Sequence, residues 1–432
     1  MRIQHVHIKN FKSIKNIDLD VPMFAVFVGP NGAGKTNLIQ ALSLLGDIID
    51  RGNSDPIRDI GWSDLIRREK RPARSGLCLG AKVWLPSDEL ISRRGRAQSQ
   101  STESEGYIAE CELSFSGKKE SEQIQVVNEM LVLRRENGEE ILRVSADGDS
   151  PPVVNVSNET VIRSFFSVDA QENIAQLLQT LYRSSGPFSR SAGEDRRFLR
   201  VVTSRFGFPW IKALAQSTSV QRYRLDSTSL RADSSTEGKG RTSLDGTGRG
   251  LASAVARLRG FDSEPKSTFA RILTTLQAVY SRIEDVLPVR ISSGRLTLQF
   301  KERGILEPLD QGSVSDGVLH ALALLIALSE RRTGLLAIEE PENAIHPWST
   351  RAILDYAQQA ERQAFITTHS ETVVNSIKDA NSLFIVEQGD NGTTIQAATT
   401  REKALRTILR ESGQKLGDVW LDGSLGGVPE SI

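Results

Sequence analysis

Cysteine is scarce in this sequence: 2 of 432 residues, Cys78 and Cys111, and no CxxC pair. Small disulfide frameworks and structural zinc sites draw on several cysteines at short, regular spacings. The sequence therefore predicts neither a disulfide framework nor a zinc site. The pattern fits a reducing cytoplasm.

Long apolar runs and an excess of charge of one sign are also missing. The best apolar run, 321–328, is far shorter than the ~20 residues that a membrane helix needs. The N-terminal stretch MRIQHVHIKNFKSIK is polar and basic, unlike a signal peptide. Lys and Arg number 54 and Asp and Glu 54, so bulk charge does not indicate nucleic-acid binding. We expect a chain that is neither secreted nor membrane-spanning.

A phosphate-binding motif follows the first buried strand. The apolar run 24–28 predicts a strand covered on both faces, and helical spacing begins at Asn37. Between them, GPNGAGKT matches G-x-x-x-x-G-K-[ST], in which backbone N–H groups and a helix N-terminus bind phosphate. Lys35 is predicted to reach the β- and γ-phosphates of ATP, and the Thr36 hydroxyl to bind Mg²⁺.

Two adjacent acids end a second apolar run, in GLLAIEEPENAIHP. The run 335–338 predicts a strand beside the first one. Glu339 then holds the metal, and Glu340 faces the γ-phosphate and activates water as a general base. Two solvated acids at the start of a loop are the alternative.

Two further segments complete the pattern. Ser315, Asp316 and Gly317 precede the apolar helix predicted at 318–328, where a phosphate could dock or the residues simply cap the helix. His369 follows the strand predicted at 364–367, at the end where α/β sheets bind ligands. Taken singly, a histidine at such a place is more often structural.

The order GPNGAGKT, VSDG, LLAIEEPEN, ITTHS resembles the ABC-type ATPases of the RecF/SMC/OLD group. The resemblance implies that Ser315–Gly317 is the signature contacting the γ-phosphate bound by a second subunit, and that His369 is the γ-phosphate switch. Two features depart from the family's pattern: Glu339 stands where Asp is usual, and DIGWSDL, in the region of the Q-loop, contains no glutamine. The implied nucleotide-binding residues are Gly29, Pro30, Asn31, Gly32, Ala33, Gly34, Lys35, Thr36, Ser315, Asp316 and Gly317; the catalytic ones are Lys35, Glu340 and His369; the Mg²⁺ ligands are Thr36 and Glu339.

The predicted fold class is α/β: a P-loop ABC-type head assembled from both chain ends, with an inserted antiparallel β region and a helical lobe. The expected boundaries are 1–76 and 291–432 for the head, 77–165 for the β-rich insertion and 166–290 for the helical lobe. No heptad pattern persists, which argues against a long coiled coil. An arginine cluster at 190–205 fits DNA binding or a solvated face, and His5 and His7 fit a metal site or, more readily, strand packing.

The resemblance implies an ATPase of slow turnover that forms an ATP-sandwiched homodimer or a higher oligomer. The C-terminal KLGDVWLDGSLGGVPE resembles stand-alone ATPases encoded beside a small Toprim-like protein. We therefore expect a sensor or scaffold in anti-phage defence, with a separate nuclease effector and no nuclease activity of its own. The segment after His369 is too short for a fused Toprim domain. Two alternatives stay open: a RecF-like repair ATPase that binds DNA, and a scaffold that scarcely hydrolyses ATP.

Overall fold

A computed structural model describes residues 1–67, 76–87, 106–117, 124–147, 153–159, 161–162, 209–234, 244–261, 268–330, 334–401 and 415–428. The arginine cluster at 190–205 and the helical pattern predicted from 170 to 208 lie outside these residues. Within them, no helix is both long and apolar enough to cross a membrane.

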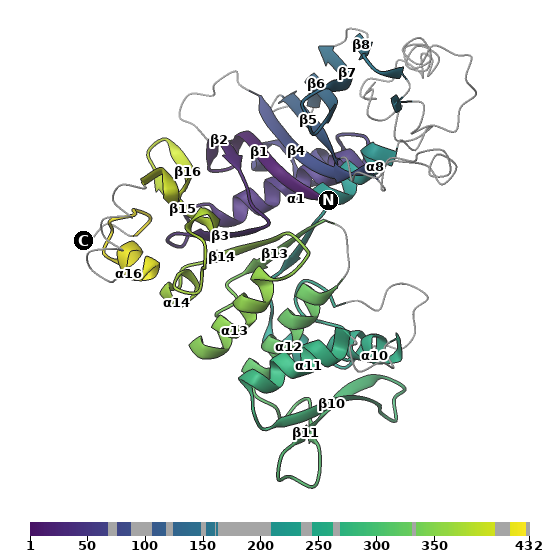
Figure 1. Ribbon diagram of the computed structural model, residues 1–432, viewed down its shortest axis with the longest axis vertical. Coiled ribbons are helices and arrows are strands. Elements are labelled where there is room, and N and C mark those ends of the chain that lie inside the picture. The colour runs from purple at the N-terminus through teal and green to yellow at the C-terminus, as the bar shows by residue number, and fades with distance from the viewer. Residues whose placement is uncertain are drawn as a thin grey trace.

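A parallel core forms one end of a 13-stranded sheet, in which the five neighbours β15-β3-β14-β13-β9 all run the same way. Their bounds are β3 Phe24–Val28, β9 Val220–Tyr223, β13 Leu335–Glu339, β14 Ala364–Thr368 and β15 Leu383–Gly389. Every residue of β3, β13 and β14 is buried, as expected for strands covered on both faces. Their carboxyl ends therefore meet at one edge of the sheet (Figure 1).

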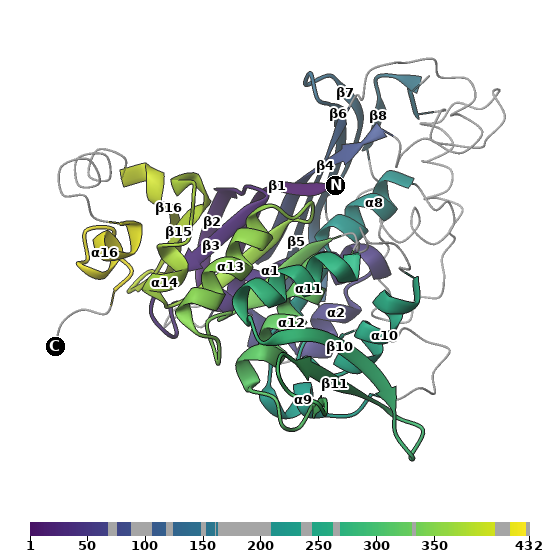
Figure 2. The same ribbon diagram turned by 60° about the horizontal axis from the view of Figure 1, so that its bottom comes forward.

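Helices cover the two faces of this core because alternate strand residues point to opposite sides. Ala25 and Phe27 pack with helix α1 (Lys35–Arg51) and helix α8 (Pro209–Thr218), whereas Val26 and Val28 pack with helix α12 (Asp316–Ser329) on the other face. Figure 1 shows α12 and α13 (Pro347–Gln358) together below β13 and β14, and Figure 2 turns both helices toward the viewer. The apolar helix predicted at 318–328 is thus a fully buried helix of this second layer.

An antiparallel arm extends the same sheet in the order β8-β7-β6-β5-β4-β1-β2, and β16 joins it to the core by pairing parallel to β2 and antiparallel to β15. The bounds are β1 Arg2–Phe11, β2 Ile14–Asp20, β4 Leu77–Pro86, β5 Gly106–Gly117, β6 Ile124–Arg135, β7 Glu140–Asp147, β8 Val153–Val156 and β16 Gly392–Ala397. The strands predicted between 77 and 146 are all present; β4 hydrogen-bonds to β1 of the head, and the other strands follow in turn (Figure 1). Short helices α2 (Asp55–Ile60) and α3 (Trp62–Leu65) follow α1.

The remaining elements lie mainly on the α12 side. They are α9 Ser227–Arg231, α10 Leu251–Phe261, α11 Thr268–Val279, α14 Glu371–Val374, α16 Leu416–Leu421, the 3-10 turns Ala380–Ser382 and Ala398–Arg401, and a three-stranded sheet of β10 Ile283–Arg290, β11 Leu296–Glu302 and β12 Leu309–Asp310. The segment predicted as a helical lobe contributes β9 to the head sheet and β10 to the small one, which sequence patterning did not indicate. The domain boundaries themselves stay a prediction.

Candidate nucleotide-binding site

The P-loop connects β3 to α1, as predicted. Gly34 stands at the helix N-cap with φ of 102°, a left-handed conformation that favours glycine. The Lys35 ammonium folds back onto the loop and donates to the carbonyl oxygens of Gly29 (2.7 Å) and Pro30 (3.0 Å). Burial lowers the pKa of Lys35, while the charges of Glu340 and Glu342 raise it. A buried ammonium held only by carbonyl dipoles is well placed to turn toward an incoming phosphate.

Residues from both chain ends brace the back of this loop. A Cβ atom on Gly34 would lie 2.2 Å from the Thr393 hydroxyl oxygen and 2.8 Å from that of Ser13. Thr393 also donates to the Ala33 carbonyl (2.8 Å), and Asn37 donates to the Ser13 hydroxyl (2.7 Å). Glycine is therefore required here for close approach as well as for backbone conformation.

Glu339 points to the α1 face of the sheet. It shares that side with Leu335 and Ala337, which pack in the α1 cluster, and its carboxylate lies 3.5 Å from the Thr36 hydroxyl. These two oxygen donors suit Mg²⁺, and when bound the ion would neutralise phosphate charge. We had expected β13 to lie beside β3, but β14 lies between them. Glu339 still reaches Thr36 because both lie at the carboxyl edge.

An arginine that the sequence did not indicate is the present partner of Glu339. Arg222 on β9 bonds both carboxylate oxygens, through Nε to Oε1 and through a terminal nitrogen to Oε2 at 3.2 Å. The Glu339 side chain is only 5% exposed and that of Arg222 is 37% exposed. The predicted metal ligand is therefore neutralised by Arg222 in this structure.

Glu340 turns the other way, since its φ of 49° is in the left-handed region that non-glycine residues rarely adopt. Its carboxylate accepts from the Asn343 amide (2.9 Å) and lies 3.7 Å from Nδ1 of His369. A cavity of about 40 Å³ opens beside Glu340 and Asn343. The structure thus brings Glu340 and His369 together, as predicted, from the ends of neighbouring strands.

A third acid at this edge was missed. Glu342 accepts from the Thr368 hydroxyl (2.6 Å) and from the backbone N–H of His369 (3.4 Å), and its Oε1 lies 3.8 Å from the His369 ring. Its side chain is 14% exposed. Glu342 therefore fixes the backbone that carries His369. The PEN sequence contained this acid, but only the pairing of β13 with β14 indicates its role.

The predicted signature begins α12 and is held by Arg231 of α9. The Arg231 guanidinium donates to the carbonyl oxygens of Gln311, Gly312 and Val314 and pairs with the Asp316 carboxylate at 2.6 Å. Hydrogen bonding to Arg231 lowers the pKa of the Asp316 carboxyl. Asp316 is thus one anchor of this loop. Its contact with a nucleotide stays a prediction.

Ser315 and Gly317 are placed differently. Ser315 is exposed and its side chain makes no capping hydrogen bond, so its hydroxyl can bind something outside the chain. A Cβ atom on Gly317 would lie 2.8 Å from the Tyr280 hydroxyl and 3.0 Å from the Ala344 carbonyl. Among the described residues, no hydrogen bond or ion pair joins Ser315–Gly317 to the P-loop of the same chain. The cis site thus comprises the P-loop, Glu339, Glu340 and His369.

Comparison with known proteins fits this geometry. Residues 24–375, more than half of the chain, match a family described as "AAA domain, putative AbiEii toxin, Type IV TA system". The chain belongs to this AAA-domain family. The match runs from β3 past His369, so it contains every predicted site residue.

Curated relatives match over shorter stretches of this AAA-domain chain. The chromosome partition protein Smc of Methanocaldococcus jannaschii is 34% identical over 80 residues, 18% of this chain and 7% of the relative. The DNA replication and repair protein RecF of Lactococcus lactis subsp. cremoris is 27% identical over 111 residues, 26% of this chain and 30% of RecF. The OLD nuclease of Thermus scotoductus is 43% identical over 47 residues, 11% of this chain and 9% of the nuclease. The predicted kinship with the RecF/SMC/OLD group is confirmed, although the chain spans less than a third of each relative.

Among solved structures, an Smc head bound to the C-terminal winged-helix domain of ScpA aligns with a TM-score of 0.46 and 13% identity. The alignment covers 92% of this chain and 98% of that one. The Thermotoga maritima SMC head domain aligns with a TM-score of 0.39 and 12% identity, over 92% of this chain and 99% of that one.

Proposed function

We propose that this AAA-family ATPase is a nucleotide-gated dimer switch that controls a separate effector protein, a Toprim-like nuclease, in anti-phage defence. The single observation that carries the switch is the meeting of Lys35, Glu339, Glu340 and His369 at one edge of the parallel core. Lys35 leaves the loop carbonyls to bind the β- and γ-phosphates. Thr36 and Glu339 would hold Mg²⁺ after Arg222 releases the carboxylate, and the ion would neutralise phosphate charge.

In the proposed hydrolysis, Glu340 accepts a proton from water as that water attacks the γ-phosphate. Asn343 orients the Glu340 carboxylate, since its amide already bonds Oε2. His369 contacts the γ-phosphate, and this contact is lost when the phosphate leaves. The exposed Ser315 hydroxyl supports closure by a second copy, because a serine free of capping bonds is available to bind the partner's nucleotide. ATP thereby favours one assembly and ADP another.

The first experiment is an ATP-dependent affinity purification of the Glu340→Gln variant from its native host, followed by mass spectrometry. The amide cannot accept the proton, so ATP stays bound and the closed dimer accumulates. Lys35→Ala, which removes the phosphate-binding ammonium, is the matched control that should not dimerise with ATP. A stoichiometric small nuclease in the first sample and not in the second supports the proposal. If light scattering shows a monomer both with and without ATP, the proposed dimer switch is wrong.

A RecF-like DNA-binding ATPase is the second candidate, favoured by the 111-residue match to RecF. If this candidate is right, double-stranded DNA should raise the rate of ATP hydrolysis several-fold, and this stimulation should decline strongly at higher salt. Recovery of DNA and repair proteins with the trapped variant, and no effector, would favour it. A trapped variant indistinguishable from wild type in ATP retention would instead support a scaffold that scarcely hydrolyses ATP.

A further inference from the structure

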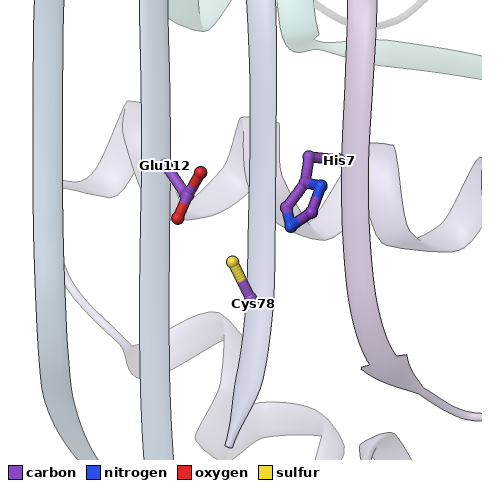
Figure 3. A group of neighbouring side chains, drawn as sticks. All are labelled: His7, Cys78 and Glu112. Atoms are coloured by element: carbon purple, nitrogen blue, oxygen red, sulfur yellow. The ribbon is translucent and has the colours of Figure 1, made fainter. Parts of the chain in front are cut away.

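Three side chains with metal-binding atoms meet on the polar face of the antiparallel arm, away from the nucleotide site. His7 on β1 is opposite Gly80 on β4, and Gly80 is opposite Glu112 on β5. Cys78 lies two residues from Gly80 on the same strand, so it points to the same face. Figure 3 shows the three side chains gathered over this middle strand.

The group is compact and partly shielded from solvent. The imidazole nitrogen, the thiol sulfur and the carboxylate oxygen all lie within 4.8 Å of one another. Cys78 is 7% exposed and the His7 side chain is 17% exposed. A Cβ atom on Gly80 would lie 3.0 Å from the Cys111 carbonyl oxygen and in ordinary contact, at 3.5 Å, with the Glu112 side chain. In the part of the chain that the structure describes, this is the only such group of three.

The histidine is already oriented as a ligand. Nδ1 of His7 bonds the Asp18 carboxylate on β2 at 2.9 Å, and a neutral ring can make that bond only by donating its Nδ1 proton. The unprotonated nitrogen is then Nε2, which is free to bind a metal. A carboxylate behind a metal-binding histidine is the usual second-shell arrangement. His5 has no such freedom, because its two nitrogens bond Asp18 (3.1 Å) and Asp20 (2.7 Å).

We propose that His7, Cys78 and Glu112 form a zinc site with an open fourth position. Zinc takes imidazole nitrogen, thiolate sulfur and carboxylate oxygen, and needs four ligands in tetrahedral geometry. The soft thiolate disfavours Mg²⁺, which takes oxygen donors. A thiolate and a carboxylate together neutralise Zn²⁺, so the metal carries no net charge into a half-buried place. Bound zinc would tie β1, β4 and β5 together where the arm joins the head.

The proposed site departs from the expectation drawn from cysteine spacing. That expectation looked for paired cysteines close in sequence, whereas these three residues lie on three strands and include one cysteine only. The spacing of His5 and His7 had suggested a metal site or strand packing. The proposal gives His7 the first role and His5 the second.

The test uses the full chain without an affinity tag, loaded with Zn²⁺, exchanged into metal-free buffer containing millimolar Mg²⁺, and assayed by elemental analysis. We expect one zinc retained per chain. Cys78→Ser and His7→Gln should each weaken zinc binding by about 100-fold or more, and Asp18→Asn by about 10–100-fold. Loading with Co²⁺ gives a second readout. The thiolate-to-cobalt absorption band should vanish in Cys78→Ser and remain in Cys111→Ser.

Cys111→Ser is the matched control. Cys111 is also buried on β5, next to Glu112 in sequence, so it points to the opposite face and should not affect zinc. Far-ultraviolet circular dichroism confirms that each variant is folded, and Asp18→Asn leaves all three ligands intact. No stoichiometric zinc in the wild type, or equal retention in Cys78→Ser and His7→Gln, would overturn the proposal. Neither result bears on ATP binding, which uses the other end of the sheet.

Discussion

Arg222 offers the sharpest test of how the metal site works. In this structure its guanidinium occupies the carboxylate that Mg²⁺ needs, so metal binding must displace it. Replacing Arg222 with Gln removes the competing charge and keeps much of the side-chain volume. We expect the variant to bind Mg²⁺ more tightly than the wild type in the presence of a non-hydrolysable ATP analogue. The substitution removes a residue from the site, yet binding should improve because that residue competes with the metal.

The magnitude follows from the contacts. A hydrogen bond to a charged group contributes about 1.5–3 kcal/mol, and solvent at the 37%-exposed guanidinium reduces the value, so we take about 2 kcal/mol for the pair. Since about 1.4 kcal/mol is a factor of ten, the Mg²⁺ dissociation constant should fall about 30-fold. Without metal the variant should be less stable by about 1–3 kcal/mol, because the buried Glu339 carboxylate is left without its hydrogen-bond partner.

The assay is the midpoint of thermal unfolding as a function of Mg²⁺ concentration, at fixed saturating analogue. Chelation of Mg²⁺ by free analogue is the same in both proteins, so the shift between the two curves reports the site. Arg282→Gln is the control, since it removes the same charge from a side chain that is 72% exposed. Unchanged or weaker Mg²⁺ binding in Arg222→Gln would refute the reasoning and indicate that Arg222 assists nucleotide binding instead.

Three further predictions concern the signature and the core. Arg231→Gln should leave ATP affinity unchanged but abolish dimer-dependent hydrolysis, measured by nucleotide titration and phosphate release. Because Arg231 lowers the Asp316 pKa, the stability deficit of this variant should be full above about pH 4, shrink as the pH falls through the lowered pKa, and be absent below it. Gly317→Ala should displace Tyr280 or Ala344 and lower the rate by up to about 100-fold, with ATP binding intact; an unchanged rate contradicts this. Phe27→Ala should cost about 3–5 kcal/mol in chemical unfolding, since Phe27 is 0% exposed and its ring centre lies 5.1 Å from that of Phe384.

The parts of the site that were predicted correctly are those built from a single continuous segment of the sequence. The P-loop needs only the run from Gly29 to Thr36, and the strand that ends in Glu339 needs only its own apolar residues. For the same reason the strands of the antiparallel arm were found, because each shows its own boundaries and turns. Alternation along β13 even explains which of the two acids faces Thr36.

The unpredicted parts depend on pairing between distant segments. Arg222 meets Glu339 because β9 pairs with β13, 117 positions away along the chain. The insertion of β14 between β3 and β13 likewise leaves no local trace. Nothing in the sequence around Arg231 shows that its guanidinium binds the loop that begins α12. Sequence patterns indicate the helices and strands, and the order of the strands in the sheet decides which charged side chains come into contact.

The brace behind the P-loop has a consequence for protein synthesis. Ser13 and Thr393, which touch each other at 2.6 Å, are 380 residues apart, so the loop cannot be supported until the ribosome has made almost all of this sequence. Contacts of such long separation form late in folding. A nascent chain that already contains GPNGAGKT therefore lacks a finished pocket for ATP. A finished pocket therefore requires a chain translated through Thr393, by which point the signature, the acids and the switch histidine have all been made.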